Sequence, residues 1–339
     1  MAKSVSLPIV EPPFATYHTY ASGGAVLKNN PSILNWYYTR ASLLRCDRRF
    51  LDGYTSPGLY VSDVNMHHIP HLECREIPME PLGEHVHDVI RELLDNEYYV
   101  HFYDIDDYYM MGKSWYMERH FPHDGLICGY DEKDSTYSIY AYDKSWLCRV
   151  FKCPVACFEK GRQASFERGI FGRLVAIKPK ETQVALDYKA MCQNLKIYLN
   201  SSLEKFPPDL KSNPLKKQFV VTGLAVHDYI CIYLDKLLDG SIPYERMDRR
   251  VFRLIWEHKR VMHDRFRIVE EALGLDNKLS ESYAEIVKKA DNARMLYASY
   301  HMKRRDPLLA HLKKILQSTK EEEKPLIHAF IEKVEGCNI

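Results

Sequence analysis

The spacing of apolar residues changes near the middle of the chain. Up to about residue 180, short apolar runs are interrupted by Gly, Pro and Asp, whereas from 181 onward apolar residues recur at helical spacing. A length of 339 residues is enough for two domains. We therefore predict an α+β domain over residues 1–180 and a mostly helical domain over residues 181–339.

The first half contains several short runs typical of strands. They are rich in Tyr, Val, Ile and Phe and cover residues 98–103, 126–130, 138–142 and 171–177. A polar turn at 131–134 separates the second run from the third and predicts an antiparallel hairpin. Amphipathic spacing predicts helices over residues 31–46 and 82–94.

The second half is predicted to be helical apart from one strand, at 219–226. Helices are expected at 184–199, 227–238, 249–273, 281–302, 307–317 and 321–334. The apolar stripe from Val251 to Val269 in the third of these is expected to face the core. The charged run 320–324 is predicted to be a solvated helix start, and the Pro-containing segment 206–217 a connector.

Composition and charge exclude several classes of protein. Apolar residues make up 46% and charged residues 27%, as in folded chains. Lys and Arg number 47 against 46 Asp and Glu, which argues against a nucleic-acid partner. No apolar run approaches the roughly 20 residues of a membrane span, and residues 1–13 lack the apolar core of a secretory signal. Nine scattered cysteines suit reduced thiols, so we expect a cytoplasmic protein.

The densest chemical signal lies between residues 98 and 143. His123 stands just before the first strand of the predicted hairpin, and Asp143 ends the second. Antiparallel pairing brings these two positions together. An Asp that orients a His is the base-and-orienter arrangement of nucleophilic catalysis. The alternative is a packing His beside a surface Asp.

A group of acids follows the strand at 98–103. Asp104, Asp106 and Asp107 precede Tyr108, and this set suits the binding of a cationic amine. A solvated turn is the alternative interpretation. We take Asp104, Asp107 and Tyr108 as candidate substrate-binding residues.

A second cluster has the spacing of metal ligands. His68, His71 and Cys74 are three residues apart. Pro70 would break a helix that aligned them, and no second pair has the spacing of a zinc finger. We therefore predict no metal site.

The order of residues between 98 and 143 resembles one known family. The shared pattern is a strand, an Asp followed by two Tyr, a further Tyr, a His-x-x-His pair and a Gly-Tyr-Asp hairpin. In this chain these are Asp107, Tyr108, Tyr109, Tyr116, His120, His123 and Gly129 to Asp131. The pattern resembles the N-terminal domain of butirosin biosynthesis protein H, a member of the papain-like cysteine-peptidase superfamily near the C39-type peptidases. The resemblance covers about residues 80–170 well and 10–60 loosely.

The resemblance implies a fold and an activity. It implies a papain-like domain with an antiparallel sheet, followed here by a helical domain that covers the cleft or binds a partner. Such enzymes, like the similar amide synthase of closthioamide assembly, move an acyl group from a carrier-protein thioester to an amine. The donor would be the phosphopantetheine arm of an acyl or peptidyl carrier protein, with no other cofactor, and the acceptor a small amine. His123 would be the catalytic histidine and Asp143 its orienting acid.

The chain departs from this family at the nucleophile. The family's catalytic Cys begins the first helix, but residues 14–24 contain no thiol and offer only Thr16, Thr19 and Ser22. Cys46 is the first thiol and our candidate nucleophile, although it ends a predicted helix, where the dipole disfavours a thiolate. Cys74, next to Arg75, is another.

Three functions remain open from the sequence. An activated thioester needs no protein nucleophile, so a bound amine could attack it directly with His123 as general base. A papain-like hydrolase, either a peptidase or a thioesterase, is a second possibility. A catalytically inactive papain-like binding module is a third, and the missing early Cys favours it.

Overall fold

The computed structural model describes residues 2–201 and 219–337. The chain divides into two compact units. Unit 1 contains Met1–Ile33 and Asn65–Gln183, and unit 2 contains Leu34–Val64 and Val184–Ile339. Residues 34–64, which the sequence placed in the first domain, thus belong to unit 2. The predicted connector at 206–217 lies outside the described residues.

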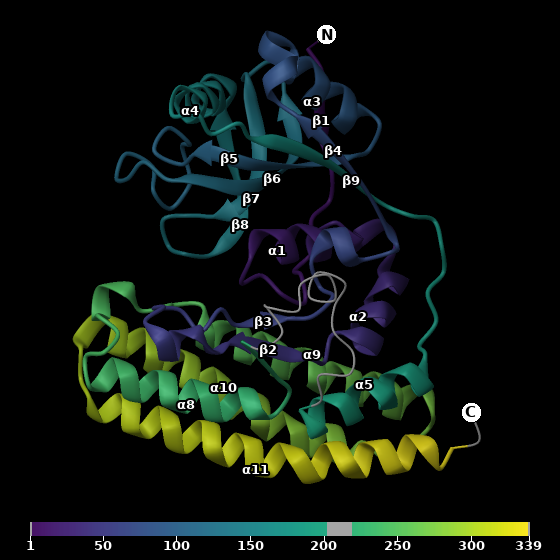
Figure 1. The fold of residues 1–339 in the computed structure, drawn as a ribbon. Coiled ribbons are helices and arrows are strands. Elements are labelled where there is room, and N and C mark those ends of the chain that lie inside the picture. The colour runs from purple at the N-terminus through teal and green to yellow at the C-terminus, as the bar shows by residue number, and fades with distance from the viewer. Residues whose placement is uncertain (1, 202–218, 338–339) are drawn as a thin grey trace. The chain divides into compact units, whose positions relative to one another are not determined.

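Unit 1 is built on a seven-stranded sheet in the order β4-β9-β5-β6-β7-β8, with β1 paired to β6 (Figure 1). Every ladder in this sheet is antiparallel. The predicted hairpin is confirmed as β6 and β7. The strands are β1 (Ser4–Ser6), β4 (Leu72–Pro78), β5 (Tyr99–Asp106), β6 (Pro122–Asp131), β7 (Thr136–Tyr142), β8 (Cys148–Pro154) and β9 (Arg173–Pro179).

Three α-helices pack on this sheet, α3 and α4 on one face and α1 on the other (Figure 1). Helix α3 buries Val86, Ile90 and Leu94, which recur every four residues and join the core between α3, α4 and the sheet. The helices are α1 (His18–Ala25), α3 (Val86–Asp95) and α4 (Val155–Glu167), and short 3₁₀ turns occur at Leu27–Asn29, Pro31–Ile33, Met66–His68 and Glu80–His85.

A bulge in β5 determines where its last residues point. The register of β5 against β6 shifts between Phe102 and Ile105, and Asp104 there has a positive φ of 61°. An extra residue in one strand bends it and redirects the side chains that follow. After the bulge, Ile105 pairs with His123, so the acidic end of β5 lies opposite the start of β6.

Unit 2 combines a small sheet, ordered β10-β2-β3, with long helices. The predicted apolar stripe of α9 is confirmed, because its members from Val251 to Val269 are buried. The strands are β2 (Leu44–Asp47), β3 (Tyr60–Val61) and β10 (Val220–Thr222). The helices are α2 (Leu34–Arg40), α5 (Tyr188–Asn200), α8 (Ala225–Leu238), α9 (Val251–Ala272), α10 (Lys278–Lys303) and α11 (Pro307–Glu335), with 3₁₀ turns at Arg48–Asp52 and Tyr244–Arg246.

Three sequence predictions for unit 2 are wrong in detail. The helix expected over 31–46 ends at Arg40, and residues 44–47 form β2 because they pair with β10, some 175 residues later. Residues 307–317 and 321–334 form the single helix α11. The charged run 320–324 is not a solvated start. Its Glu323 is fully buried and pairs with the fully buried Lys259 at 2.6 Å.

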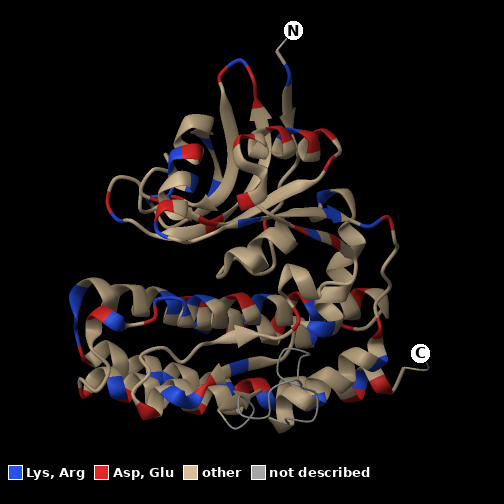
Figure 2. Cartoon of the chain, turned by 45° about the horizontal axis from the view of Figure 1, so that its top comes forward, with Lys and Arg blue, Asp and Glu red and all other residues tan. Residues whose placement is uncertain are grey.

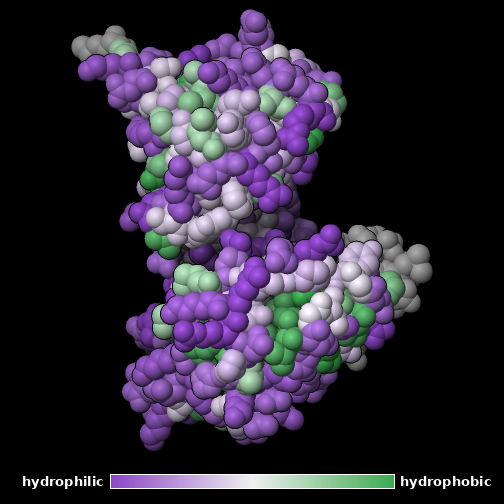
Figure 3. All heavy atoms as spheres, turned by 90° about the vertical axis from the view of Figure 1, so that its left-hand side faces the viewer, coloured by the Kyte–Doolittle hydropathy of each residue, from purple (hydrophilic) through white to green (hydrophobic). Residues whose placement is uncertain are grey.

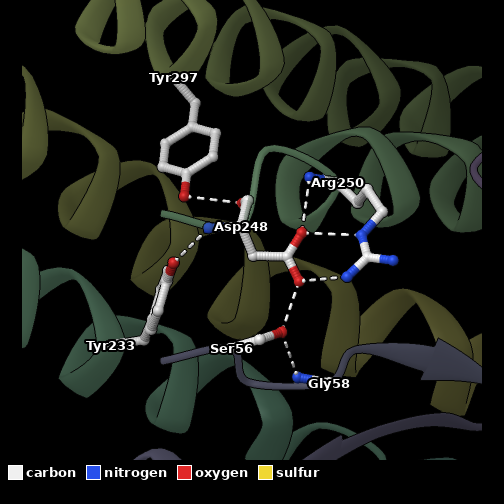
Figure 4. A network of polar contacts seen from close by, with 6 residues as sticks. All are labelled: Ser56, Gly58, Tyr233, Asp248, Arg250 and Tyr297. Carbon is white, nitrogen blue, oxygen red and sulfur yellow. Dashed lines mark hydrogen bonds and ion pairs between the residues drawn. The ribbon is translucent and has the colours of Figure 1, made fainter. Parts of the chain in front are cut away.

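A second polar network ties the loop before β3 to the helices of unit 2 (Figure 4). Asp248 is 7% exposed, and its carboxylate accepts hydrogen bonds from the Ser56 hydroxyl at 2.5 Å and from Arg250 at 2.9 Å. The Tyr233 hydroxyl accepts the Asp248 N–H, and the Tyr297 hydroxyl donates to its carbonyl oxygen. Since these partners come from the loop, α8, the residue before α9, and α10, the side chain and backbone of Asp248 together connect four segments.

Replacing Asp248 tests this network. Burial opposes ionisation of its carboxyl, but the bonds from Arg250 and Ser56 outweigh burial, so its pKa lies below the ordinary value. We expect Asp248→Asn to lower the free energy of unfolding in urea by about 1–3 kcal/mol near neutral pH. A carboxyl whose pKa is lowered in the folded state stabilises the fold at pH values above its ordinary pKa. The difference in free energy of unfolding between wild type and Asp248→Asn should therefore shrink as pH falls below about 4. Glu271→Gln, on the surface of α9, is the control and should change stability by less than about 0.5 kcal/mol.

Candidate active site

The candidate active site forms where β5 ends and β6 begins. The Nδ1 atom of His123 lies 3.2 Å from Oδ2 of Asp107. The Asp107 side chain has no exposed surface, whereas the His123 side chain is 27% exposed. Because a carboxylate only accepts hydrogen bonds, this contact favours the tautomer with the proton on Nδ1, which leaves the lone pair on Nε2. His123 therefore has the arrangement of an oriented base.

Lys113 completes the surroundings of Asp107. Its Nζ atom lies 3.1 Å from Oδ1 of Asp107 and donates a hydrogen bond to the Asp124 carbonyl oxygen, and its side chain is also fully buried. The backbone holds Lys113 in place, because its N–H bonds to the Met110 carbonyl and the residue forms a β-bridge with Asp143. A buried carboxylate requires such partners, since loss of hydration otherwise costs several kcal/mol. Asp107 thus lies between an ammonium group and an imidazole.

The start of helix α1 faces His123. The His18 ring meets the His123 ring edge-on, with centroids 4.6 Å apart, and lies 5.3 Å from the Tyr142 ring. The Tyr142 hydroxyl donates to the Ala15 carbonyl oxygen at 2.6 Å, which ties the segment before α1 to β7. The first residue of α1 thus places an imidazole beside the His123 ring.

A second pair of polar side chains joins α1 to the sheet. Ser22, one turn after His18, places its hydroxyl 2.8 Å from Nδ1 of His101 on β5. Both residues are buried. Burial lowers the pKa of His101 far below its usual value, and the nearby charges of His67 and Lys113 lower it further. With no solvent access in the structure, this pair serves packing of α1 on the sheet.

A second His–Asp pair lies beside the first, and sequence reasoning missed it. Nδ1 of His120 lies 2.8 Å from Oδ2 of Asp106. The other oxygen of this buried carboxylate accepts the backbone N–H groups of Tyr108 and Phe121. Two adjacent Asp residues thus hold two His residues three positions apart. The signal in the sequence was the pair of adjacent acids, Asp106 and Asp107, followed by two histidines three positions apart.

The predicted pair of His123 and Asp143 is wrong. The Asp143 carboxylate lies 2.7 Å from Nε of Arg149 and accepts the backbone N–H groups of Ser145 and Leu147. Asp side chains commonly bond to the backbone two residues on and so close their own turn. The acid that contacts His123 is Asp107, which the sequence offered as a substrate-binding residue.

Cys46 is not placed as a nucleophile. It lies in β2 of unit 2 and is 1% exposed, and burial together with the adjacent Asp47 raises the pKa of its thiol. Burial also raises the pKa of Cys74 to about 11 and those of Cys128 and Cys153 to about 12. A reactive thiol requires a lowered pKa. In the described chain, the polar and ring contacts of His123 are with Asp107, His18 and Phe121, none of which carries sulfur.

The predicted substrate-binding residues have different surroundings. Asp107 is committed to Lys113 and His123, and the Tyr108 ring stacks on His120 at 4.2 Å, so neither is placed to bind an amine. Asp104 is half-buried at the bulge of β5 and lies beside Asp124. Burial raises the pKa of Asp124 above its usual value, and the charge of Asp104 adds to this. Asp104 remains suited to a cationic group.

The residues with the spacing of metal ligands, His68, His71 and Cys74, do not come together as a metal site in the structure. Across the described residues, no three His, Cys, Asp or Glu side chains are placed to hold an ion. Cys74 directs its sulfur to the Met66 carbonyl oxygen, and His67 approaches the Tyr103 hydroxyl at 3.2 Å. None of the helices in the described segments has the length and apolar character needed to cross a membrane.

Charge and hydropathy are mixed over the molecule. Basic and acidic residues are interspersed along the ribbons in Figure 2, in keeping with the net charge of +1. On the face drawn in Figure 3, apolar residues reach the surface in groups separated by hydrophilic ones.

No protein-family model matches the chain, and no curated protein matches it.

Removing the lysine tests how Asp107 is held. We expect Lys113→Met to lower the free energy of unfolding by about 3–5 kcal/mol, because it leaves a buried carboxylate with one partner fewer. Urea unfolding near neutral pH measures the loss, and the double variant Lys113→Met with Asp107→Leu should recover part of it. A loss below about 1 kcal/mol in the single variant would contradict a role for this ion pair.

The buried His101 makes a second prediction, for pH. Its folded pKa is lower than that of the unfolded chain, so acidification protonates the unfolded state first. The neutral His101 ring contributes fully to the free energy of unfolding above about pH 6.5. As pH falls below that value, the free energy of unfolding decreases by up to about 1.4 kcal/mol per pH unit. Urea unfolding between pH 7.5 and 5 should show a steeper loss for the wild type than for His101→Gln. Equal slopes would contradict a buried neutral His101.

Proposed function

We propose that unit 1 is an acyltransferase in which His123 acts as general base and an amine attacks a thioester directly. The observation that carries this proposal is a partly exposed imidazole held through Nδ1 by a fully buried carboxylate. Nε2 of His123 removes a proton from the attacking amine as the new C–N bond forms. The C–S bond then breaks, and the departing sulfur takes this proton from His123, which leaves an amide and a free thiol.

The absence of a thiol beside His123 favours direct attack over an acyl-enzyme. His18 lies next to the His123 ring, and burial raises the pKa values of the Cys46 and Cys74 thiols. A thioester is already activated, so a positioned base contributes about 10²–10⁴-fold. Holding amine and thioester together supplies effective molarities of about 10⁵–10⁸ M. Neither effect requires a covalent intermediate.

The acids near His123 are suited to the acceptor. Asp104 and Asp124 lie close together at the bulge, and Asp124 neighbours His123 in β6. A cationic amine would be attracted to this position and would release one proton to solvent, and the neutral amine would then lose its second proton to His123 during attack. This assignment replaces Asp107, whose carboxylate is already bound by Lys113 and His123.

The donor we propose is the phosphopantetheine arm of an acyl or peptidyl carrier protein, in the cytoplasmic assembly of a natural product. Free cysteines at all nine positions agree with reduced thiols. The start of α1 against the His-bearing strand β6 supports a papain-like arrangement of unit 1, as the sequence resemblance implies. No further cofactor is needed for this chemistry.

A catalytically inactive binding module is the second candidate. The same contact between His18 and His123 supports it, because an imidazole fills the position where a papain-like enzyme would carry its thiol. A thioesterase or peptidase would instead release its acyl group to water. The three functions therefore differ in product: an amide, an acid, or none.

One assay separates the candidates. Purified protein is incubated with N-acetylcysteamine thioesters and a panel of small amines, and the products are identified by mass spectrometry. We expect amide formation, reduced about 10²–10⁴-fold in His123→Ala. His120→Ala, a histidine three residues away on its own carboxylate, is the matched control and should retain activity. Acid as the main product would indicate a hydrolase, and no product from any pair would indicate the binding module.

A further inference from the structure

The exposed apolar side chains of unit 1 are concentrated in two segments. Six large apolar residues are exposed among its described residues, and five of them lie between 111 and 150. These five, which we call the Trp–Met patch, are Met111, Met117, Trp146, Leu147 and Val150. The remaining one, Phe171, lies elsewhere in the chain. Concentrations of exposed apolar surface commonly mark interaction sites.

The two segments lie side by side. The rings of Trp115 and Trp146 meet edge-on at 5.2 Å. The Ser114 N–H donates to the Tyr142 carbonyl oxygen at 3.1 Å, and Lys113 forms a β-bridge with Asp143. The Trp–Met patch is therefore one feature built from two loops.

Ring contacts connect the patch with the candidate active site. Trp115 lies 6.4 Å from Phe121, whose ring lies 4.9 Å from that of His123. A partner bound on the patch would therefore be only a few side chains from the proposed base.

Both loops have strained backbone at exposed apolar residues. Met117 has φ 59° and is 60% exposed, and Trp146 has φ 58° and is 44% exposed. Bulky residues rarely adopt this left-handed conformation, because it brings the side chain close to its own backbone. The Asp143 carboxylate holds the second loop by accepting the N–H groups of Ser145 and Leu147. The chain thus fixes a conformation that presents two apolar side chains to solvent.

Two cations lie over aromatic rings of the segments that carry the patch. The Arg119 guanidinium lies 5.7 Å from the ring centroids of both Trp115 and Phe121, and the Lys144 ammonium lies 5.5 Å from the Tyr116 ring. Across the described residues, no carboxylate forms an ion pair with Arg119 or Lys144. Glu118 is the exposed acid of the first loop, and Asp143 in the second is already bound to Arg149. The exposed charge around the apolar residues is thus mainly positive.

We propose that the Trp–Met patch docks an acidic protein, and, resting on the function proposed above, that this protein is the carrier that delivers the thioester. Trp, Met and Arg are enriched at protein interfaces, and Trp and Arg dominate their binding energy. A small acyl group would require a concave pocket instead, whereas these side chains are exposed. Positive charge around the patch complements a negative partner and speeds its association.

Binding of a carrier protein without its arm tests the docking separately from the chemistry. The probe is a purified acidic acyl carrier protein in its apo form, labelled with fluorescein and titrated with the full chain in an anisotropy assay. We expect binding that weakens at least tenfold in Met117→Asp and in the double variant Arg119→Gln with Lys144→Gln. It should also weaken between 50 and 300 mM salt. Phe171→Ser, the exposed apolar residue outside the patch, is the matched control and should bind like the wild type.

The outcomes separate docking from catalysis. Met117→Asp changes the most exposed residue of the patch, and Leu147→Ser provides a second variant if that protein does not fold. Absence of binding, or equal binding by wild type and patch variants, would overturn the docking proposal even if amides form from N-acetylcysteamine thioesters. Docking through the patch without any amide formation would instead overturn the proposed function alone. Amide formation from the small thioester should be unchanged in the patch variants.

Discussion

The central constraint in unit 1 is that the Asp107 carboxylate has no contact with solvent. Such a group is stable only where cationic or hydrogen-bonding partners replace its hydration. Here the partners are Lys113 on one oxygen and His123 on the other. The turn that carries Lys113, its bridge to Asp143 and the bulge in β5 all serve to bring these groups together. The proposed base is thus oriented by a contact that the fold requires for its own stability.

The two adjacent acids at the end of β5 have different roles. One oxygen of Asp106 accepts hydrogen bonds from two backbone N–H groups and so fixes the loop between β5 and β6. Its other oxygen contacts His120, which is more exposed than His123. Among the described residues, the partners of the Asp107 carboxylate are the side chains of Lys113 and His123. The His123 ring faces α1 and neighbours Asp124, a combination that places it next to the acids suited to an amine. This asymmetry is why we assign the chemistry to His123.

Much of the local structure was predictable from the sequence, because it depends on local patterns. The hairpin of β6 and β7 follows from two β-rich runs and a polar turn, and the buried stripe of α9 follows from helical spacing. Strand β2 was not predictable in this way, since its partner β10 is distant in sequence. The burial of Glu323 within a run of charges likewise depends on Lys259, some 60 residues away.

The candidate site was predicted only in part. His123 was singled out by its place before the hairpin, but the sequence assigned it to Asp143 because simple antiparallel register favours that pairing. The bulge in β5 and the turn closed by the Asp143 carboxylate are invisible in spacing alone. The position of His18 beside His123 also depends on how α1 packs on the sheet.

The most direct test of this account is the tautomer of His123. Nitrogen NMR of the histidine-labelled chain near pH 7.5, with the signal assigned through His123→Gln, reports which ring nitrogen carries the proton. We expect a proton on Nδ1 in the wild type and a shift toward Nε2 in Asp107→Asn, because the amide no longer requires a donor at Nδ1. A wild-type ring protonated on Nε2, or the same tautomer in both proteins, would contradict the claim that Asp107 orients His123 as a base.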